Sequence, residues 1–240
     1  MVNCGAAMYI SPIGVVNACN PKAAYDEGIA FAMAHQCSYG LEAAGVLAAC
    51  IAKAFEPEVS VEDLVSTALT YAKDGTYKAI EAITNIAQKL KINRDNKDLV
   101  VEQFHKVISE FSPTGNHINI KIEKVGQPSN YHTPSRLFSI EELPIALGYI
   151  VLHDGKFHEA INDGVNSGRD TDSIGVMIGA ILGAMHGTQP IKTKDIDTLE
   201  RVNKQNLEVC AKEFSEVARN IILGDISEFN KRKGILEHLL

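Results

Sequence analysis

Residues 165–187 constrain the fold of this chain more than any other stretch. The stretch begins polar and turn-forming, and from residue 174 to residue 185 it is apolar and rich in small side chains. Its glycines recur at every fourth position, at Gly175, Gly179, Gly183 and Gly187, which places them on one stripe of a helix. Because glycine inside a helix costs about 1 kcal/mol relative to alanine, the stripe predicts that another helix backbone comes close. The apolar run is too short to span a bilayer, so we expect a central buried helix of a soluble protein.

Asp170, Asp172 and Ser173 stand where the polar part meets this helix. On a tight turn their oxygens can converge on one hard cation, since Mg²⁺ and Ca²⁺ prefer carboxylate and hydroxyl ligands. The alternative is that Asp172 or Ser173 only caps the helix. Spacing alone favours the cap, because an Asp-x-Asp-Ser pattern is short and weakly specific.

Composition and charge exclude several classes of function. The chain has 240 residues, a net charge of −7 and no basic stripe, so nucleic-acid binding by electrostatic attraction is not expected. Its five scattered cysteines form no C-x-x-C pair, which fits a reducing compartment better than a disulfide framework. Since neither a signal peptide nor a membrane anchor is recognisable, we expect a cytoplasmic protein without membrane contact.

Helical patterns account for most of the remaining chain. Capping residues and apolar spacing predict helices over residues 21–36, 38–55, 60–73, 77–90, 98–111, 139–152, 157–165 and 196–223, the last as a long closing helix. Alternating isoleucines predict one short extended segment near residues 117–123. Tyr131 lies in the polar loop that follows and is a candidate for stacking on an adenine ring. We expect a single compact α-helical domain over residues 1–240.

Two strings resemble a known family. The string Val-Asn-Ser-Gly-Arg-Asp-Thr-Asp-Ser-Ile-Gly at residues 165–175, before a Gly- and Ala-rich helix, resembles the C-terminal signature of the ADP-ribosylglycohydrolase family, which includes the dinitrogenase reductase-activating glycohydrolases. Residues 3–14 are similar to that family's Gly-Asn-Gly-Ala-Ala-Met loop, with Cys4 in place of Asn and Tyr9 in place of Arg. The resemblance implies an all-α fold and a pair of Mg²⁺ or Mn²⁺ ions, with Asp170, Asp172 and Ser173 in the places of metal ligands.

The resemblance also implies where a substrate binds. Asn3, Cys4, Gly5 and His35 are expected to hold the diphosphate or the ribose of an ADP-ribosyl group. Asn166, Gly168 and Arg169 of the signature, together with Tyr131, complete the candidate substrate contacts. Arg169 stands where many relatives have glycine, and its cation is expected to contact a phosphate or to pair with an aspartate.

Part of the family pattern is not found in this sequence. The family's N-terminal portion carries a Thr-Asp-Asp metal motif and a catalytic Glu, and the match here starts almost at Met1. We therefore expect an N-terminally incomplete domain that holds half of a two-metal site, with a complementing chain or a second copy as partner.

The leading hypothesis is divalent-metal-dependent hydrolysis of a glycosidic bond to ADP-ribose, on a modified protein or a small molecule. The residue that serves as general acid or base is unknown. Two alternatives stay open. One is a protein that binds ADP-ribose or another nucleotide without turnover, and the other is a fragment that is active only with a complementing chain.

Overall fold

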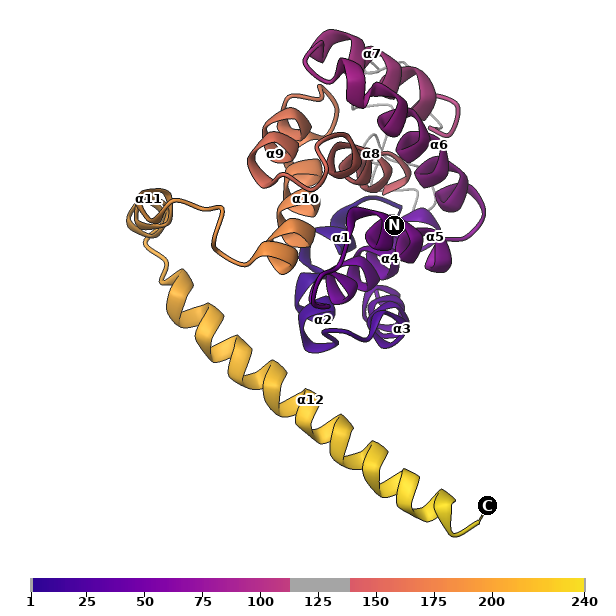
Figure 1. The fold of residues 1–240 in the computed structure, drawn as a ribbon, viewed down its shortest axis with the longest axis vertical. Helices are drawn as coiled ribbons and strands as arrows, with labels where there is room; N and C mark the ends of the chain where they lie inside the picture. Colours follow the sequence, from indigo (N-terminus) through magenta and orange to yellow (C-terminus); the bar gives the residue numbers. More distant parts are fainter. Residues whose placement is uncertain (1, 113–138, 240) are drawn as a thin grey trace.

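The computed structural model describes residues 2–112 and 139–239, and within them the chain forms helices and no strand (Figure 1). In order the helices are α1 (Gly5–Tyr9), α2 (Ser11–Val16), α3 (Pro21–Ala32), α4 (Tyr39–Ala54), α5 (Val61–Tyr71), α6 (Asp74–Leu90), the 3₁₀ turn η1 (Lys91–Asn93), α7 (Lys97–Ile108), α8 (Ser139–Leu152), α9 (Phe157–Val165), α10 (Thr171–His186), α11 (Thr193–Asn203) and α12 (Leu207–Glu237). The expected all-α fold is confirmed. The extended segment expected near residues 117–123 lies outside the described residues, as does Tyr131.

Local sequence signals set several helix starts. Ser60 and Asp63 form a capping box before α5, in which the Ser60 hydroxyl accepts from the Asp63 amide at 3.1 Å and Asp63 Oδ2 accepts from the Ser60 amide at 2.9 Å. Asn20 caps α3 and Asn96 caps α7 in the same way, through side-chain oxygens that accept from amides three residues on. The sequence placed the starts of α3, α5 and α7 to within a residue, and of these three caps it had identified the one at Ser60.

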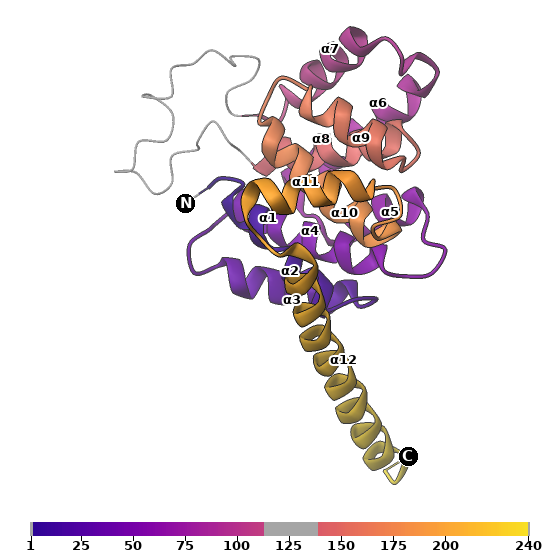
Figure 2. The same ribbon diagram turned by 90° about the vertical axis from the view of Figure 1, so that its left-hand side faces the viewer.

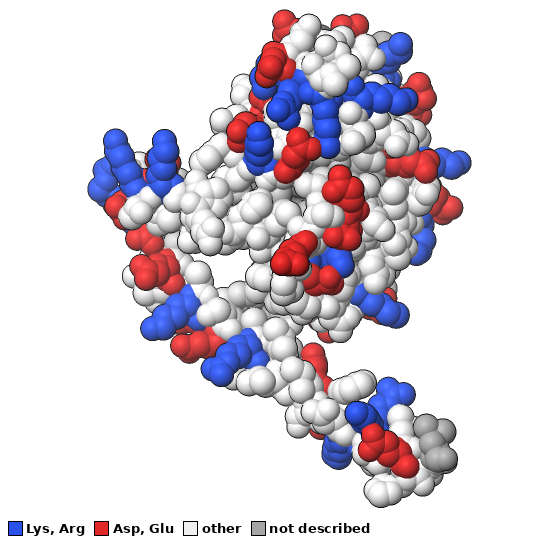
Figure 3. Space-filling model, viewed as in Figure 1, with Lys and Arg blue, Asp and Glu red and all other residues white. Residues whose placement is uncertain are grey.

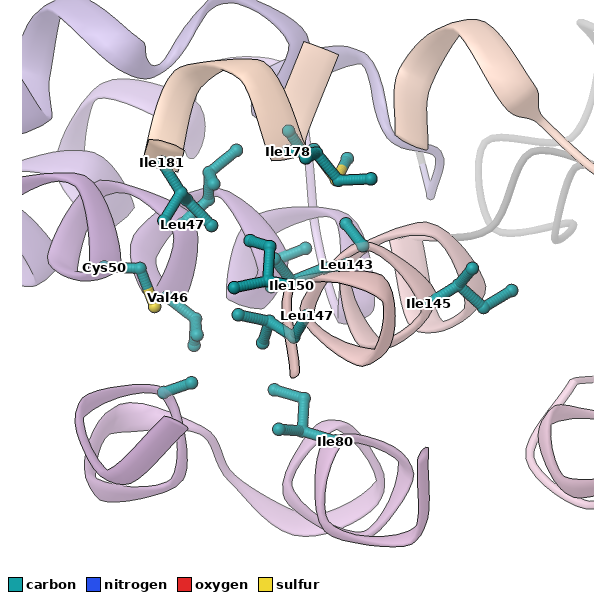
Figure 4. Packing of buried hydrophobic residues seen from close by; sticks show 14 of the residues in the cluster. Val46, Leu47, Cys50, Ile80, Leu143, Ile145, Leu147, Ile150, Ile178 and Ile181 are labelled. Carbon is teal, nitrogen blue, oxygen red and sulfur yellow. The ribbon is translucent and has the colours of Figure 1, made fainter. Parts of the chain in front are cut away.

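The core is centred on α4 and α8. Every residue of α4 from Ala43 to Ala52 is buried, because its small side chains let neighbouring helices approach. α3 lies so close that a Cβ built on Gly28 would be 3.2 Å from the Cα of Gly45. On its other side α4 packs against α8 and α10, where Leu47, Ile150 and Ile181 meet in the core (Figure 4).

The glycine stripe on α10 does not have the role expected from the sequence. α10 is buried along one face only, which carries Ile174, Met177, Ile178, Ile181 and Leu182, whereas the glycines lie on its other side. A Cβ at Gly183 or Gly187 would meet no atom within 4 Å among the described residues, and one at Gly179 would meet only Ile161, at 3.9 Å. At Gly175, by contrast, a Cβ would lie 2.8 Å from Val165 Cγ1 at the end of α9. A second helix therefore comes close only at the start of the stripe, with a side chain and not with its backbone, and α4 and α8 are the central helices of the described part of the chain.

The end of the chain also differs from the expected closing helix. α11 ends at Asn203, where Lys204 adopts a left-handed conformation with φ of 52°, and α12 begins anew with Asn206 as its cap. α12 packs on α2 near the buried Ala218 and then extends away from the other helices (Figures 1 and 2). It leaves large apolar side chains exposed, among them Val217, Ile221, Leu223, Ile226, Phe229, Ile235 and Leu236.

The surface is mixed in charge. On the face shown in Figure 3, Lys and Arg side chains alternate with Asp and Glu along α12, in keeping with the near balance of the two signs in that helix. Among the described helices, none combines the length and the apolar character that crossing a bilayer requires.

Two glycine-to-alanine substitutions test this packing. A Cβ at Gly14 would lie 2.7 Å from Ile51 Cβ and 2.9 Å from the Ala48 carbonyl oxygen. Gly14→Ala is therefore expected to lower the free energy of unfolding by about 1–3 kcal/mol through overpacking.

Gly183→Ala places a methyl group in open space inside a helix. This substitution is expected to raise the free energy of unfolding by up to about 1 kcal/mol. Urea unfolding followed by circular dichroism measures both changes. A destabilised Gly183→Ala protein would show that the stripe is covered after all.

Candidate metal centre

The N-terminal ends of three helices meet at the candidate site. α1 begins after Cys4, α8 carries Glu141 and Glu142 in its first turn, and α10 begins after Asp170. α10 packs against both of the other helices. The partial positive charge at helix N-termini stabilises carboxylates, which favours this concentration of acidic side chains.

Asp170 occupies the N-cap position of α10, yet its side chain makes no capping hydrogen bond. Its Oδ2 accepts instead from the Cys4 thiol, 3.3 Å away. Asp172 and Ser173 also hydrogen bond to Asp170, and burial followed by the bond to Asp172 raises the pKa of Asp170. The structure thus brings together the three side chains that the sequence proposed as metal ligands, and none of them caps the helix. Asp172 is exposed and Ser173 is buried.

Cys4 and Glu142 lie in the same cluster. The Cys4 sulfur is 3.4 Å from Ser173 Oγ, and one ligand atom each of Cys4, Glu142 and Asp170 lie within 4.8 Å of one another. Glu142 is 1% exposed, and neither carboxylate oxygen has a hydrogen-bond partner in the described part of the chain. Burial and then the charge of Glu141 raise the pKa of Glu142 well above its usual range. Burial likewise raises the pKa of the Cys4 thiol to about 12.

Arg169 is held by an ion pair inside the protein. Its guanidinium donates to Glu141 at 2.6 Å, and the two side chains are only 4% and 5% exposed. The Ser112 hydroxyl donates to the second oxygen of Glu141. Arg169 therefore pairs with a glutamate of α8, a partner that the sequence did not indicate.

The turn before α10 is also fixed from α7. His105 Nε2 lies 2.7 Å from the Ser167 carbonyl oxygen, which holds the turn against α7. Gly168 then adopts φ of 82°, a conformation that side chains disfavour, and its Cα faces the His105 ring. Gly168 is thus placed in the turn by backbone geometry.

Asn3 and Gly5 form a small polar network around a residue the sequence did not single out, Gln36. Asn3 Oδ1 accepts from the Gly5 amide at 2.9 Å and from Gln36 Nε2 at 2.7 Å, while the Asn3 amide donates to Gln36 Oε1 at 3.3 Å. Gly40 is required there, because a Cβ would lie 2.6 Å from Gln36 Oε1 and 2.7 Å from the Asn3 carbonyl oxygen. Through Cys4, this network adjoins the acidic cluster.

His35 and Asn166 lie at the edges of this arrangement. His35 is exposed, with Nδ1 3.5 Å from the Tyr9 hydroxyl and its ring 5.5 Å from the Tyr9 ring. Tyr9, in turn, meets the exposed Phe31 edge-on. Asn166 is exposed at the end of α9, donates to the Asn162 carbonyl oxygen at 2.6 Å and lines a separate hollow of about 150 Å³ beside Tyr149. Tyr131, the remaining candidate, lies outside the described residues.

Sequence interpretation missed Glu141, Glu142 and Gln36. Glu141 and Glu142 had a detectable signal, because they are the only charged residues in α8, whose other residues are almost all apolar. Two buried charges at the start of a core helix need partners, which points to a site. Gln36 had no such signal, because its role depends on a contact with Asn3, 33 residues away.

The arrangement fits a divalent cation. Three carboxylates, Glu142, Asp170 and Asp172, are present in addition to the Glu141 that Arg169 neutralises. Carboxylate, hydroxyl and sulfur donors converge on one place, and a buried carboxylate without a partner is costly unless a cation or a proton compensates it. The residues present can therefore hold a metal ion at the head of α10.

Comparisons with known proteins identify similar sequences. The family model described as ADP-ribosylglycohydrolase matches residues 1–222. An uncharacterized protein of Escherichia coli (strain K12), YegU, is 26% identical over 209 residues, which cover 83% of this chain and 55% of YegU. The chain thus spans about half the length of this curated relative. No solved structure matches the chain significantly.

Breaking the buried ion pair tests its structural role. Arg169→Met keeps most of the side-chain volume but leaves Glu141 buried beside Glu142 without its cation, so we expect a loss of about 3–5 kcal/mol in the free energy of unfolding. Lys22→Met, which removes an exposed ion pair with Asp26, is the matched control and is expected to leave the urea midpoint unchanged. Equal effects of the two substitutions would contradict a special role for the buried pair.

The raised pKa of Glu142 predicts a pH dependence of stability. In the chelator-treated protein Glu142 stays protonated above pH 4.5, its usual pKa, whereas the unfolded chain loses that proton. Stability is therefore full below that pH and falls as the pH rises, until the folded-state pKa is passed. Glu142→Gln should remove this decline between pH 5 and pH 7, and the exposed control Glu62→Gln should retain it. Urea unfolding across this range measures both, and parallel pH profiles of wild type and Glu142→Gln would refute the assignment.

Proposed function

Because this chain belongs to the ADP-ribosylglycohydrolase family, we propose that it takes part in hydrolysis of a glycosidic bond to ADP-ribose, on a modified protein or a small molecule. The observation that carries the proposal is the convergence of Asp170, Asp172 and Ser173 with Cys4 and Glu142 at the head of α10. This geometry supports a cation-dependent glycohydrolase better than a helical scaffold, since a scaffold has no need of buried carboxylates without partners.

In this proposal Asp170, Asp172 and Ser173 hold a divalent ion, Mg²⁺ or Mn²⁺, and the complete family site holds two. A bound ion would supply electrostatic stabilisation of the ribose hydroxyls and of the attacking water. The chain's own contribution is to keep these ligands in place. The Arg169–Glu141 pair anchors the turn to α8, and His105 anchors it to α7.

The substrate would lie across the start of α1. Asn3, Cys4 and Gly5 are proposed to face the diphosphate or ribose, with Gln36 fixing the Asn3 amide. His35 and Tyr9 offer exposed rings beside them. Tyr131, Asn166 and Gly168 remain proposed contacts, whereas the buried pairing of Arg169 supports a positioning role for that residue.

The general acid or base stays unknown. Of the acids in the cluster, Glu141 is paired with Arg169 and Glu142 is fully buried, so neither has the access to water that a general base needs. This observation favours the second candidate function, binding of ADP-ribose or another nucleotide without turnover. It equally favours a third, in which a complementing chain or a second copy supplies the acid or base to the domain proposed over residues 1–240.

A cytoplasmic location is part of the same proposal. Cys4 and Cys50 are buried thiols, and Cys19 and Cys210 are exposed thiols that form no disulfide within the described residues. Exposed thiols of this kind support a reducing compartment.

Release of ADP-ribose tests the leading proposal. We expect release from an ADP-ribosylated protein or small molecule to depend on added Mg²⁺ or Mn²⁺. Replacing Asp170 and Asp172 together by alanine should lower the rate at least about 100-fold, because the ion loses its charged ligands. The control replaces Asp195 and Asp197, an exposed pair with the same spacing on α11, and should keep the full rate.

The measurement separates the three candidates. Turnover that survives loss of Asp170 and Asp172 overturns the proposed function. Calorimetric binding of ADP-ribose without turnover favours the second candidate, and turnover that appears only above a threshold protein concentration, with a matching increase in molar mass by light scattering, favours the third.

A further inference from the structure

We propose that Cys4 and Glu142 join Asp170 as ligands of a single divalent cation, so that this centre is a mixed sulfur and oxygen site that binds Zn²⁺ or Co²⁺ more tightly than Mg²⁺. The inference rests on the proposed function only in placing a cation at the head of α10. The identity of the ligands and the metal preference follow from this chain's own residues.

The distances between donor atoms suit such a site. Cys4 Sγ lies 3.3 Å from Asp170 Oδ2 and 3.4 Å from Ser173 Oγ, and the donor atoms of Cys4, Glu142 and Asp170 are within 4.8 Å of one another. In a tetrahedral zinc site, with Zn–S of about 2.3 Å and Zn–O of about 2.0–2.2 Å, sulfur and oxygen ligands are roughly 3.5 Å apart. A cation can therefore replace the thiol hydrogen bonds of Cys4 with little movement of the three helix ends.

Glu142 supplies the independent observation. Its side chain is 1% exposed, it reaches into the cluster from α8, and neither of its oxygens has a hydrogen-bond partner among the residues described. Buried carboxylates are normally hydrogen bonded, paired or bound to a metal. Arg169, the nearby cation, is already paired with Glu141, which leaves a proton or a metal ion to compensate Glu142, and the sulfur and oxygen donors that lie beside it favour the metal ion.

Cys4 differs from a cysteine that serves packing alone. Cys50 provides the comparison within the same chain, since it is fully buried in the hydrophobic core and its thiol donates to a backbone oxygen, that of Leu64 at 3.9 Å. The sulfur of Cys4 instead contacts a carboxylate and a hydroxyl that are themselves candidate ligands. A sulfur ligand favours zinc and cobalt, whereas Mg²⁺ demands oxygen ligands.

Cobalt spectroscopy tests the ligand set without reference to activity. The test uses the full chain with Cys19 and Cys210, two exposed cysteines, replaced by serine so that they cannot bind cobalt. Titration of this protein with Co²⁺ should produce an intense near-ultraviolet band from thiolate-to-cobalt charge transfer. Zn²⁺ should abolish the band by competition at stoichiometric amounts, whereas Mg²⁺ should need at least about 100-fold higher concentration.

Three variants in that background separate the ligands. Cys4→Ser should lose the band and weaken Co²⁺ binding about 10- to 100-fold, and Cys50→Ser should keep both. Glu142→Gln should keep the band, because the sulfur remains, but weaken binding to a similar degree. Circular dichroism and the thermal midpoint without metal show that each variant is folded, and if Cys4→Ser fails to fold, Cys4→Ala serves in its place.

The inference is overturned if the folded protein gives no band at saturating Co²⁺, if the band survives loss of Cys4, or if Glu142→Gln binds Co²⁺ as tightly as its parent. These outcomes are distinct from the fate of the proposed function. A band without release of ADP-ribose supports the mixed site and removes only the hydrolase, whereas Mn²⁺-dependent release without a band supports the hydrolase and removes the sulfur ligand.

Discussion

The buried ion pair between Arg169 and Glu141 is the interaction on which the candidate site depends. It joins the turn before α10 to the first turn of α8, with both side chains at most 5% exposed. Without it, two adjacent glutamates would begin a core helix uncompensated, which is among the costliest arrangements a protein interior can hold. With it, Glu141 is neutralised, and Glu142 is left to face Cys4 and Asp170.

The same geometry explains why the acidic cluster is electrostatically tolerable. α1, α8 and α10 begin around the cluster. The positive partial charges at these three helix N-termini stabilise the negatively charged carboxylates. These partial charges and a single arginine still leave a surplus of negative charge, which either protons or a cation must balance. The metal hypothesis and the raised pKa of Glu142 are thus two descriptions of one constraint.

Most of the fold followed from local sequence. The capping box at Ser60 and Asp63 placed the start of α5 correctly, because a cap involves residues only three apart, and apolar spacing placed α3 and α7. The glycine stripe on α10 led to an incorrect prediction of a closely packed helix backbone. Periodicity shows that small residues share one face of a helix, but it does not show whether another helix covers that face. The break at Lys204 was not predicted, although residues 203–206 are all polar and the apolar residues Val202 and Leu207 stand five positions apart, a spacing that does not fit one helix face.

The sequence by itself determined the all-α class and the grouping of Asp170, Asp172 and Ser173, because ligands within one helical turn are neighbours whatever the rest of the chain does. Only the tertiary structure decided that Cys4 and Glu142 belong to the same cluster, that Gln36 fixes Asn3, and that Arg169 pairs with Glu141. Those contacts join residues 28 to 166 positions apart, and their distance in space depends on how whole helices pack. No periodicity or spacing in a single sequence carries that information.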